Sequence, residues 1–188
     1  MVDKTQDLSL WPQTSNITPM EHVIGIDPGA SSGWGAVSVA PNPALLLFDS
    51  ITWPKPGTKK DLPSNTPSAI VEELVGKVGQ LGHTIVCAAI EDQYLSVNPD
   101  SMKKLARNGG RWEESFRRLG IPVVWINTQK WQSAELGTAR IKSDEVKRRC
   151  AMKVRGLWNV KIGQHAADAT LIARYHAVRL AYRKMRGQ

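Results

Sequence analysis

Cysteines and long apolar runs are scarce in this sequence, and each shortage excludes a class of protein. Its 188 residues include only Cys87 and Cys150, too few for a disulfide framework or a cysteine-based zinc site. We therefore expect a reducing compartment, the cytoplasm. No apolar stretch is long enough to span a membrane, and the polar first twenty residues lack the apolar core of a signal peptide. We expect no membrane partner, and a flexible N-terminal arm over residues 1–20.

Acidic residues are in the minority as well. The chain has 17 Asp and Glu against 25 Lys and Arg, a formal net charge of +8. Such an excess favours a polyanionic partner, with nucleic acid ahead of an anionic membrane surface. The alternative is a basic protein without any such partner.

Residues 21–188 form a pattern typical of a single α/β domain. Apolar runs at 23–26, 34–40 and 45–53 have short connections, which predicts an antiparallel meander. Two further runs, at 84–90 and 121–127, alternate with helical patterns and predict crossover strands with helices on both faces of the sheet. Helices are expected at 67–81, 98–120, 128–137, 144–156 and 163–187. Thr66 and Ser143 are expected to cap the first and fourth, and Gly109-Gly110 to mark a kink or a close approach of another backbone.

Two of the predicted strands end on a carboxylate, Asp27 in the first and Glu91 in the fourth. Neighbouring strands of an α/β sheet end at a common edge, where sites form. His165 and Asp168 are three residues apart in the last helical pattern, so they share a face, and the small alanines between them permit a close approach to another backbone. Taken singly, Asp27 could cap a turn or pair with an arginine, His165 could cap the helix, and Asp168 could complement its dipole.

Three carboxylates and an imidazole at one edge repel one another unless divalent cations neutralise them. Oxygen ligands with a single nitrogen suit Mg²⁺ or Mn²⁺ better than zinc. Two such ions about 4 Å apart can activate water and stabilise a leaving oxygen in phosphodiester cleavage. Asp27 is therefore expected to bridge metal ions.

The motifs GIDPG, AIEDQY and HAADA, in this order and spacing, resemble those of the RuvC family of Holliday-junction resolvases, nucleases of the ribonuclease-H-like fold. The similarity runs from about residue 23 to 178 and includes NPDSMKKLARNGG and the basic stretch INTQKWQSAELGTARIKSDEVKRR. The resemblance implies a homodimer, with the dimer contact expected over residues 102–119. It implies paired nicks in opposed strands of a four-way DNA junction, by hydrolysis that leaves 5′-phosphate ends. The implied cofactor is Mg²⁺, as two ions, with Mn²⁺ as a substitute.

The resemblance also assigns roles to residues of the site. Asp27, Glu91 and Asp168 match the catalytic, metal-binding carboxylates of the family. His165 falls where many members have Asp and others have His, so it is expected to act as a further catalytic ligand. An imidazole in place of a carboxylate removes one negative charge and eases the use of Mn²⁺.

Residues expected to contact DNA lie outside this cluster. Tyr94 matches an aromatic residue that stacks on bases, and Lys130 and Lys142 match basic residues beside the scissile phosphate. A buried tyrosine and two solvated lysines are equally acceptable interpretations. Most of the seven tryptophans are expected in the core, with Trp112 or Trp131 as candidates to face DNA.

The sequence leaves other functions open. One is a relaxed branched-DNA or replication-fork endonuclease with the same site, and another is a non-cleaving junction-binding protein, which would require a lost site. An actin-like ATPase needs two such domains, more than 188 residues allow. The sequence identifies no branch-migration helicase partner and does not decide between a bacterial and a viral origin.

Overall fold

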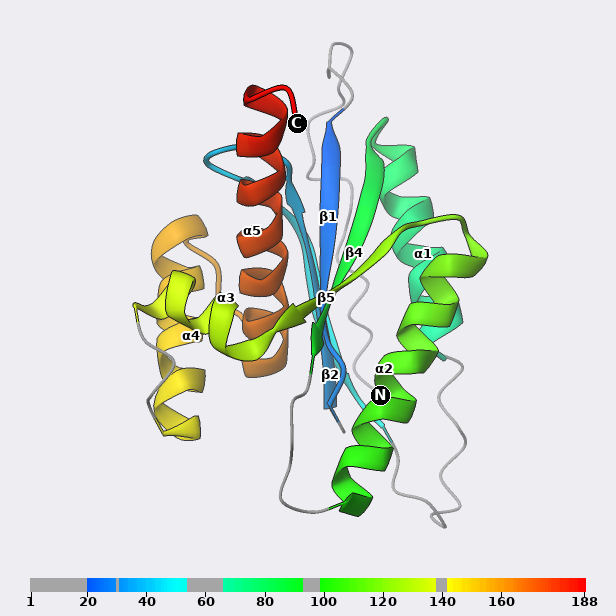
Figure 1. The fold of residues 1–188 in the computed structure, drawn as a ribbon, viewed down its shortest axis with the longest axis vertical. Helices are drawn as coiled ribbons and strands as arrows, with labels where there is room; N and C mark the ends of the chain where they lie inside the picture. Colours follow the sequence, from blue (N-terminus) through cyan, green and yellow to red (C-terminus); the bar gives the residue numbers. More distant parts are fainter. Residues whose placement is uncertain (1–19, 30, 54–65, 93–98, 138–141) are drawn as a thin grey trace.

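The computed structural model describes residues 20–29, 31–53, 66–92, 99–137 and 142–188, with the side chains of 99–102 left aside (Figure 1). Nearly all of the expected N-terminal arm lies outside these ranges, as do Tyr94 and Trp11. No helix within them is both long and apolar enough to cross a membrane.

A five-stranded mixed sheet forms the centre of the fold. The strands are β1 (Glu21–Asp27), β2 (Ser31–Ser38), β3 (Leu45–Thr52), β4 (Thr84–Asp92) and β5 (Val123–Asn127). Their order in the sheet is β3-β2-β1-β4-β5. β1, β2 and β3 pair antiparallel as the predicted meander, whereas β4 pairs parallel to β1 and β5 parallel to β4. Both predictions, the meander and the crossover strands, are confirmed.

Five helices cover the two faces of the sheet. They are α1 (Pro67–Gln80), α2 (Pro99–Arg118), α3 (Thr128–Leu136), α4 (Ser143–Trp158) and α5 (Gln164–Met185). Figure 1 shows α3, α4 and α5 on one side of the sheet and α1 and α2 on the other. A hydrophobic core fills each interface, one centred on α5 and β1, the other on α1, α2 and β4. This is the α/β, ribonuclease-H-like architecture expected from the sequence.

The capping residues expected from the sequence are right for α1 and wrong for α4. Thr66 caps α1 as expected, because its hydroxyl accepts a hydrogen bond from the Ala69 backbone N–H at 3.3 Å. The expectation for Ser143 is wrong: it is the first residue of α4, and Lys142 occupies the N-cap position without a side-chain cap.

The glycine pair in α2 does not interrupt the helix, which is continuous from Pro99 to Arg118. A Cβ on Gly109 would lie 2.7 Å from Cη2 of Trp125 in β5, whereas one on Gly110 would meet nothing within 4 Å. The close approach expected here is therefore made by an indole side chain of the same chain and not by another backbone.

Candidate active site

Asp27 and Glu91 end neighbouring strands on the same side of the sheet. The parallel register of β1 and β4 pairs Ile26 with Ile90, so the two carboxylates follow side by side. Both residues are buried, Asp27 with 6% and Glu91 with 8% of its surface exposed. Because side chains alternate along a strand, both carboxylates lie on the face covered by α5.

Helix α5 brings the other two predicted residues to this edge because the sheet beneath it carries glycine. A Cβ on Gly25 would lie 2.0 Å from the carbonyl oxygen of Ala169, and one on Gly33 would lie 2.1 Å from that of His165. The backbones of α5 and the strands therefore touch directly. This contact sets His165 and Asp168, in the first turns of α5, beside the strand ends.

His165 contacts Asp27 directly. The distance from His165 Nδ1 to Asp27 Oδ2 is 2.7 Å, and this hydrogen bond is the main reason why the pKa of His165 is raised. Gly163, which has no side chain, occupies the N-cap position of α5, so the interpretation of His165 as a helix cap is wrong. The imidazole instead holds the Asp27 carboxylate in place, which leaves Nε2 as its other polar atom.

Glu91 is a buried acid, and its surroundings raise its pKa above that of a free glutamic acid. Burial raises its pKa to about 7, and the negative charges of Asp27 and, more weakly, Asp168 act in the same direction. Hydrogen bonds from Trp131 and Thr128 oppose this shift. Trp131 Nε1 donates to Glu91 Oε1 at 2.9 Å, which fixes the orientation of the carboxyl group.

Asp168 is coupled to the same cluster. Burial raises its pKa to about 6, and the charge of Asp27 adds to the shift, while a hydrogen bond with the Cys150 thiol opposes it. Its Oδ1 atom is buried and has no hydrogen-bond partner among the described residues. A buried carboxylate oxygen without a partner is costly to desolvate, and a cation would compensate that cost.

The site fits a divalent cation in its chemistry and its electrostatics. Three carboxyl groups supply hard oxygen donors, two of them with pKa values raised partly by mutual repulsion. Within the described ranges, however, no three or more His, Cys, Asp or Glu side chains are already arranged as a metal site. The hydrogen bonds to His165 and Trp131 hold two of the carboxyl groups in their present orientations. Metal binding by Asp27, Glu91, His165 and Asp168 therefore stays a prediction.

The residues expected to contact DNA have different outcomes. Lys130, near the start of α3, and Lys142, just before α4, are exposed, and neither forms an ion pair within the described part of the chain. Their contact with DNA stays a prediction, as does that of Tyr94, which lies outside the described residues. Trp112 and Trp131 are 0% and 1% exposed, so neither presents a surface to DNA.

Several neighbours of the carboxylates were not identified from the sequence. Trp131 and Cys150 each hydrogen-bond one of them, and the positive charge of Lys147 weakly opposes the upward pKa shifts of both His165 and Asp168. Trp131 and Cys150 lie on helices remote in sequence from their partners, so no local spacing signals these contacts. The one signal in the sequence was Trp131 itself, an apolar residue directly after Lys130 in a segment similar to the family's basic stretch.

This fold and this cluster define a class of protein: a ribonuclease-H-like domain with acids at the ends of two adjacent strands and on the helix packed against them. Proteins of similar sequence are crossover junction endodeoxyribonucleases. RuvC of Citrifermentans bemidjiense is 27% identical over 158 residues, which cover 82% of this chain and 91% of that protein. RuvC of Nitratidesulfovibrio vulgaris is 28% identical over 152 residues, or 78% of this chain and 87% of the relative. These matches confirm the resemblance to the RuvC family.

Solved structures support the same fold. T. thermophilus RuvC, determined in complex with a Holliday junction substrate, superimposes with a TM-score of 0.62 at 24% identity and covers 87% of this chain. That match includes 96% of the T. thermophilus chain, so nearly all of that fold has a counterpart here. No family model matches the sequence.

Proposed function

We propose that this chain is a metal-dependent DNA endonuclease that resolves four-way junctions by paired nicks in opposed strands. The observation that carries this proposal is the convergence of Asp27, Glu91 and Asp168, from three separate elements, into one largely buried and mutually repelling cluster. The similarity to crossover junction endodeoxyribonucleases over most of the chain supports a DNA junction as the substrate. A DNA substrate also favours the cytoplasm, at the nucleoid, as the place of action.

Divalent cations are the cofactor that this donor set favours, with two Mg²⁺ ions proposed and Mn²⁺ as a substitute. Asp27, Glu91 and Asp168 would hold them, with His165 as the nitrogen ligand. Bound there, divalent cations would supply water activation and charge stabilisation on the leaving oxygen. The proposed hydrolysis adds water to the phosphorus and breaks its bond to the 3′-oxygen, which leaves a 3′-hydroxyl and a 5′-phosphate end.

The chain's own groups prepare the site for this chemistry. His165 holds one oxygen of Asp27 at 2.7 Å, and Trp131 holds one oxygen of Glu91 at 2.9 Å. Rigid strands carry both acids, so their positions do not depend on a mobile loop. The proposed contacts of Lys130, Lys142 and Tyr94 with the DNA would hold the polyanion against a site that is itself acidic.

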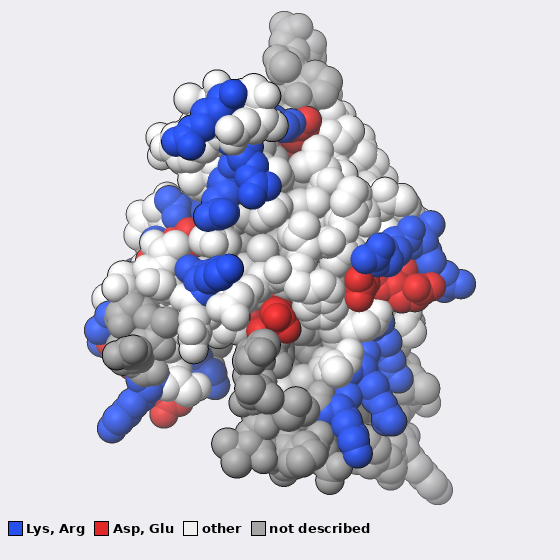
Figure 2. All heavy atoms as spheres, in the orientation of Figure 1, with Lys and Arg blue, Asp and Glu red and all other residues white. Residues whose placement is uncertain are grey.

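The basic residues of the last helix contribute to DNA binding only in part. Arg174 Nη1 lies 2.6 Å from Oε2 of the buried Glu135, and Lys153 Nζ lies 2.7 Å from the same oxygen, so these two cations fasten α3 to α4 and α5. Lys184 pairs with Glu21 of β1. On the face shown in Figure 2, Lys and Arg gather over α5 on one flank and over α2 on the other, which leaves room for DNA contacts on both flanks.

Single substitutions of the carboxylates test the proposal. Asp27→Asn, Glu91→Gln and Asp168→Asn should each abolish nicking of a synthetic four-way junction in Mg²⁺ while gel-shift affinity for the junction remains. Glu73→Gln removes an exposed acid from α1 and serves as the matched control with normal nicking. Near-normal cleavage by any of the three variants would remove that residue from the assignment.

A relaxed endonuclease that cuts forks and flaps as readily as junctions is the second candidate, because the same carboxylates would serve it. Parallel digestion of a Y-fork and a four-way junction by the wild-type chain distinguishes the two. We propose junction preference, which predicts symmetric paired nicks in the junction and slower cutting of the fork.

A further inference from the structure

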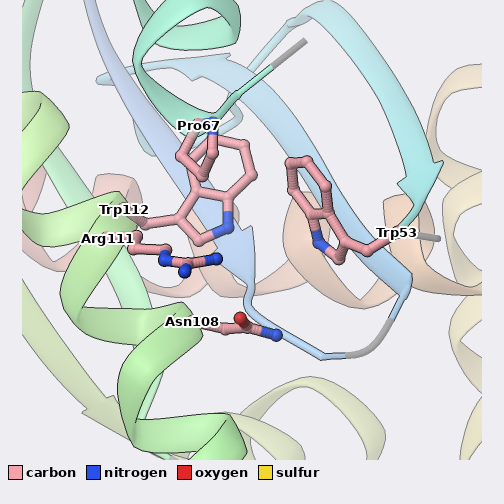
Figure 3. A pocket seen from close by; sticks show the side chains of 5 residues that line it. All are labelled: Trp53, Pro67, Asn108, Arg111 and Trp112. Carbon is pink, nitrogen blue, oxygen red and sulfur yellow. The ribbon is translucent and has the colours of Figure 1, made fainter. Parts of the chain in front are cut away.

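A small hollow lies between the end of β3 and helix α2, on the face of the sheet opposite the carboxylates. Trp53, Pro67, Asn108, Arg111 and Trp112 line it. Figure 3 shows the indole rings of Trp53 and Trp112 on two sides of the hollow, with the side chains of Arg111 and Asn108 reaching along its lower edge. The two ring centroids are 6.5 Å apart and the planes are inclined by 61°.

One wall of this hollow carries a polar group that nothing in the described chain satisfies. Trp112 is 0% exposed, yet its Nε1 donor has no hydrogen-bond partner among the described residues. A buried donor without a partner costs roughly 1–3 kcal/mol, so a small acceptor such as a water molecule in the hollow would stabilise it. Trp53 is only half-buried and leaves part of its ring open to a flat partner.

The hollow is linked to the catalytic strand by hydrogen bonds. Trp53 Nε1 donates to Ser32 Oγ at 2.9 Å, and that hydroxyl donates to the Gly29 carbonyl at 3.1 Å. Asn108 Nδ2 donates to the same Gly29 carbonyl at 3.3 Å. Gly29 follows Asp27 by two residues, so two walls of the hollow hold the turn that begins at the catalytic carboxylate.

The rim of the hollow is positively charged. Lys103, Arg107 and Arg111 are exposed and recur every four residues, which places them in one row along α2. No acid interrupts the sequence between Lys103 and Glu113, and none of the three cations pairs with a carboxylate within the described ranges. Figure 2 shows this group of basic side chains over α2 at the lower right. An aromatic hollow at the end of a cationic row matches a nucleotide, with a flat base and a phosphate beside it.

We propose that the mouth of this hollow is a nucleotide subsite, where an unpaired base of the DNA strand being cut stacks on the open part of Trp53, with the adjoining phosphate on Arg111. The inference rests on the proposed function and adds a second contact point on the opposite face of the sheet. Bases at the exchange point of branched DNA are the easiest to unpair, so they are the ones available to this subsite.

Binding measurements with abasic DNA test this proposal. In the nicking-deficient Asp168→Asn background, affinity is measured for a four-way junction and for junctions with a single abasic site at each position near the cut. One abasic position should weaken binding roughly tenfold, the size expected for loss of one stacked base. Trp53→Ala should weaken binding of the intact junction by a similar factor but add no further loss at that position.

Arg111→Ala and Arg118→Ala form a matched pair, because each removes one exposed cation from α2. Arg111→Ala should weaken junction binding several-fold and Arg118→Ala less than twofold. As Arg111 is exposed, its variant remains informative even if Trp53→Ala does not fold. The subsite is refuted if no abasic position weakens binding, or if the two arginine variants behave alike, while the wild-type chain still cuts the intact junction. Failure of the wild-type chain to cut any junction would instead refute the proposed function.

Discussion

Among single residues, the carboxyl groups of Glu91 and Asp168 hold their protons more tightly than free acids do, with pKa values of about 7 and about 6. Burial is the main cause in both, and the charge of Asp27 adds to it. A raised pKa in the folded state means that the folded protein binds protons that the unfolded chain has lost. These acids therefore destabilise the metal-free protein as the pH rises, and a bound cation removes that penalty.

The substitution Glu91→Gln should stabilise the metal-free protein at pH 8 by about 1–3 kcal/mol, while it abolishes nicking. The gain should be absent below pH 4.5, where the acid is protonated in both states, and should grow until the pH passes the folded-state pKa of about 7. Gln retains an oxygen that accepts the hydrogen bond from Trp131. Urea denaturation across this pH range measures the effect, with Glu73→Gln as the exposed control. A loss of stability at pH 8 would contradict the account.

His165→Ala should lose most nicking activity, with Mn²⁺ restoring more of it than Mg²⁺, whereas His165→Asp should remain active. The raised pKa of His165 also has a consequence for folding: the stabilisation from its bond to Asp27 is complete below pH 6.5 and declines as the pH passes the raised value. His165→Ala should therefore destabilise the metal-free protein more at pH 6 than at pH 9. Nicking rates in Mg²⁺ and in Mn²⁺ test the predicted activities, and urea denaturation at pH 6 and pH 9 tests the predicted stabilities. A folded His165→Ala protein with full activity in Mg²⁺ would assign the residue a purely structural role.

Among the elements, the contact between β1 and α5 decides whether the site exists at all. Gly25 pairs with Gly35 across β1 and β2, and both face α5 without a side chain. A Cβ on Gly25 would lie 2.0 Å from the Ala169 carbonyl oxygen and 2.6 Å from the Ala173 backbone nitrogen, atoms that cannot rotate away. The approach of this helix therefore depends on glycine in the strands as much as on alanine in the helix.

Gly25→Ala should destabilise the protein by about 3 kcal/mol and reduce nicking, because α5 must move away from the sheet and carry Asp168 with it. Gly76→Ala, in an exposed position of α1 with nothing within 4 Å of the new Cβ, should instead stabilise by about 0.5–1 kcal/mol. Thermal and urea denaturation of the two variants compare the same chemical change in opposite surroundings. Equal effects of the two substitutions would show that β1 and α5 are not in direct backbone contact.

The periodic and positional signals of the sequence predicted the helices, the antiparallel meander and the crossover strands. They also predicted that Asp27, Glu91, His165 and Asp168 would meet, because strand ends and helical spacing are local patterns. Contacts between distant segments were not predictable in this way. Trp131 was predicted as a candidate for DNA contact, but it is buried and hydrogen-bonds Glu91. The sequence does not separate these two roles, because a tryptophan that follows an exposed lysine is compatible with either. The bond between His165 and Asp27 was missed because nothing in either motif shows which way the imidazole turns.

For the molecule as a whole, paired nicks require two active sites, so the proposed mechanism predicts a homodimer. The dimer contact was expected over residues 102–119. Within that segment, the space beside Gly109 is filled by the indole of Trp125 from the same chain. The neighbouring Gly110 is open and Trp125 is 41% exposed, which leaves both on the available surface. Sedimentation at micromolar concentration should show a dimer, and Gly110→Glu should weaken it. A monomer in the presence and absence of junction DNA would contradict paired cleavage.

The most direct test of the central claim is cleavage of a synthetic mobile four-way junction by the wild-type chain, with Mg²⁺ and with the metal chelated. The account predicts symmetric nicks in two opposed strands in Mg²⁺, ends that a ligase seals without further treatment, and no product after chelation or with Asp168→Asn. Cleavage that persists without a divalent cation, or an Asp168→Asn protein that nicks like the wild type, would contradict it.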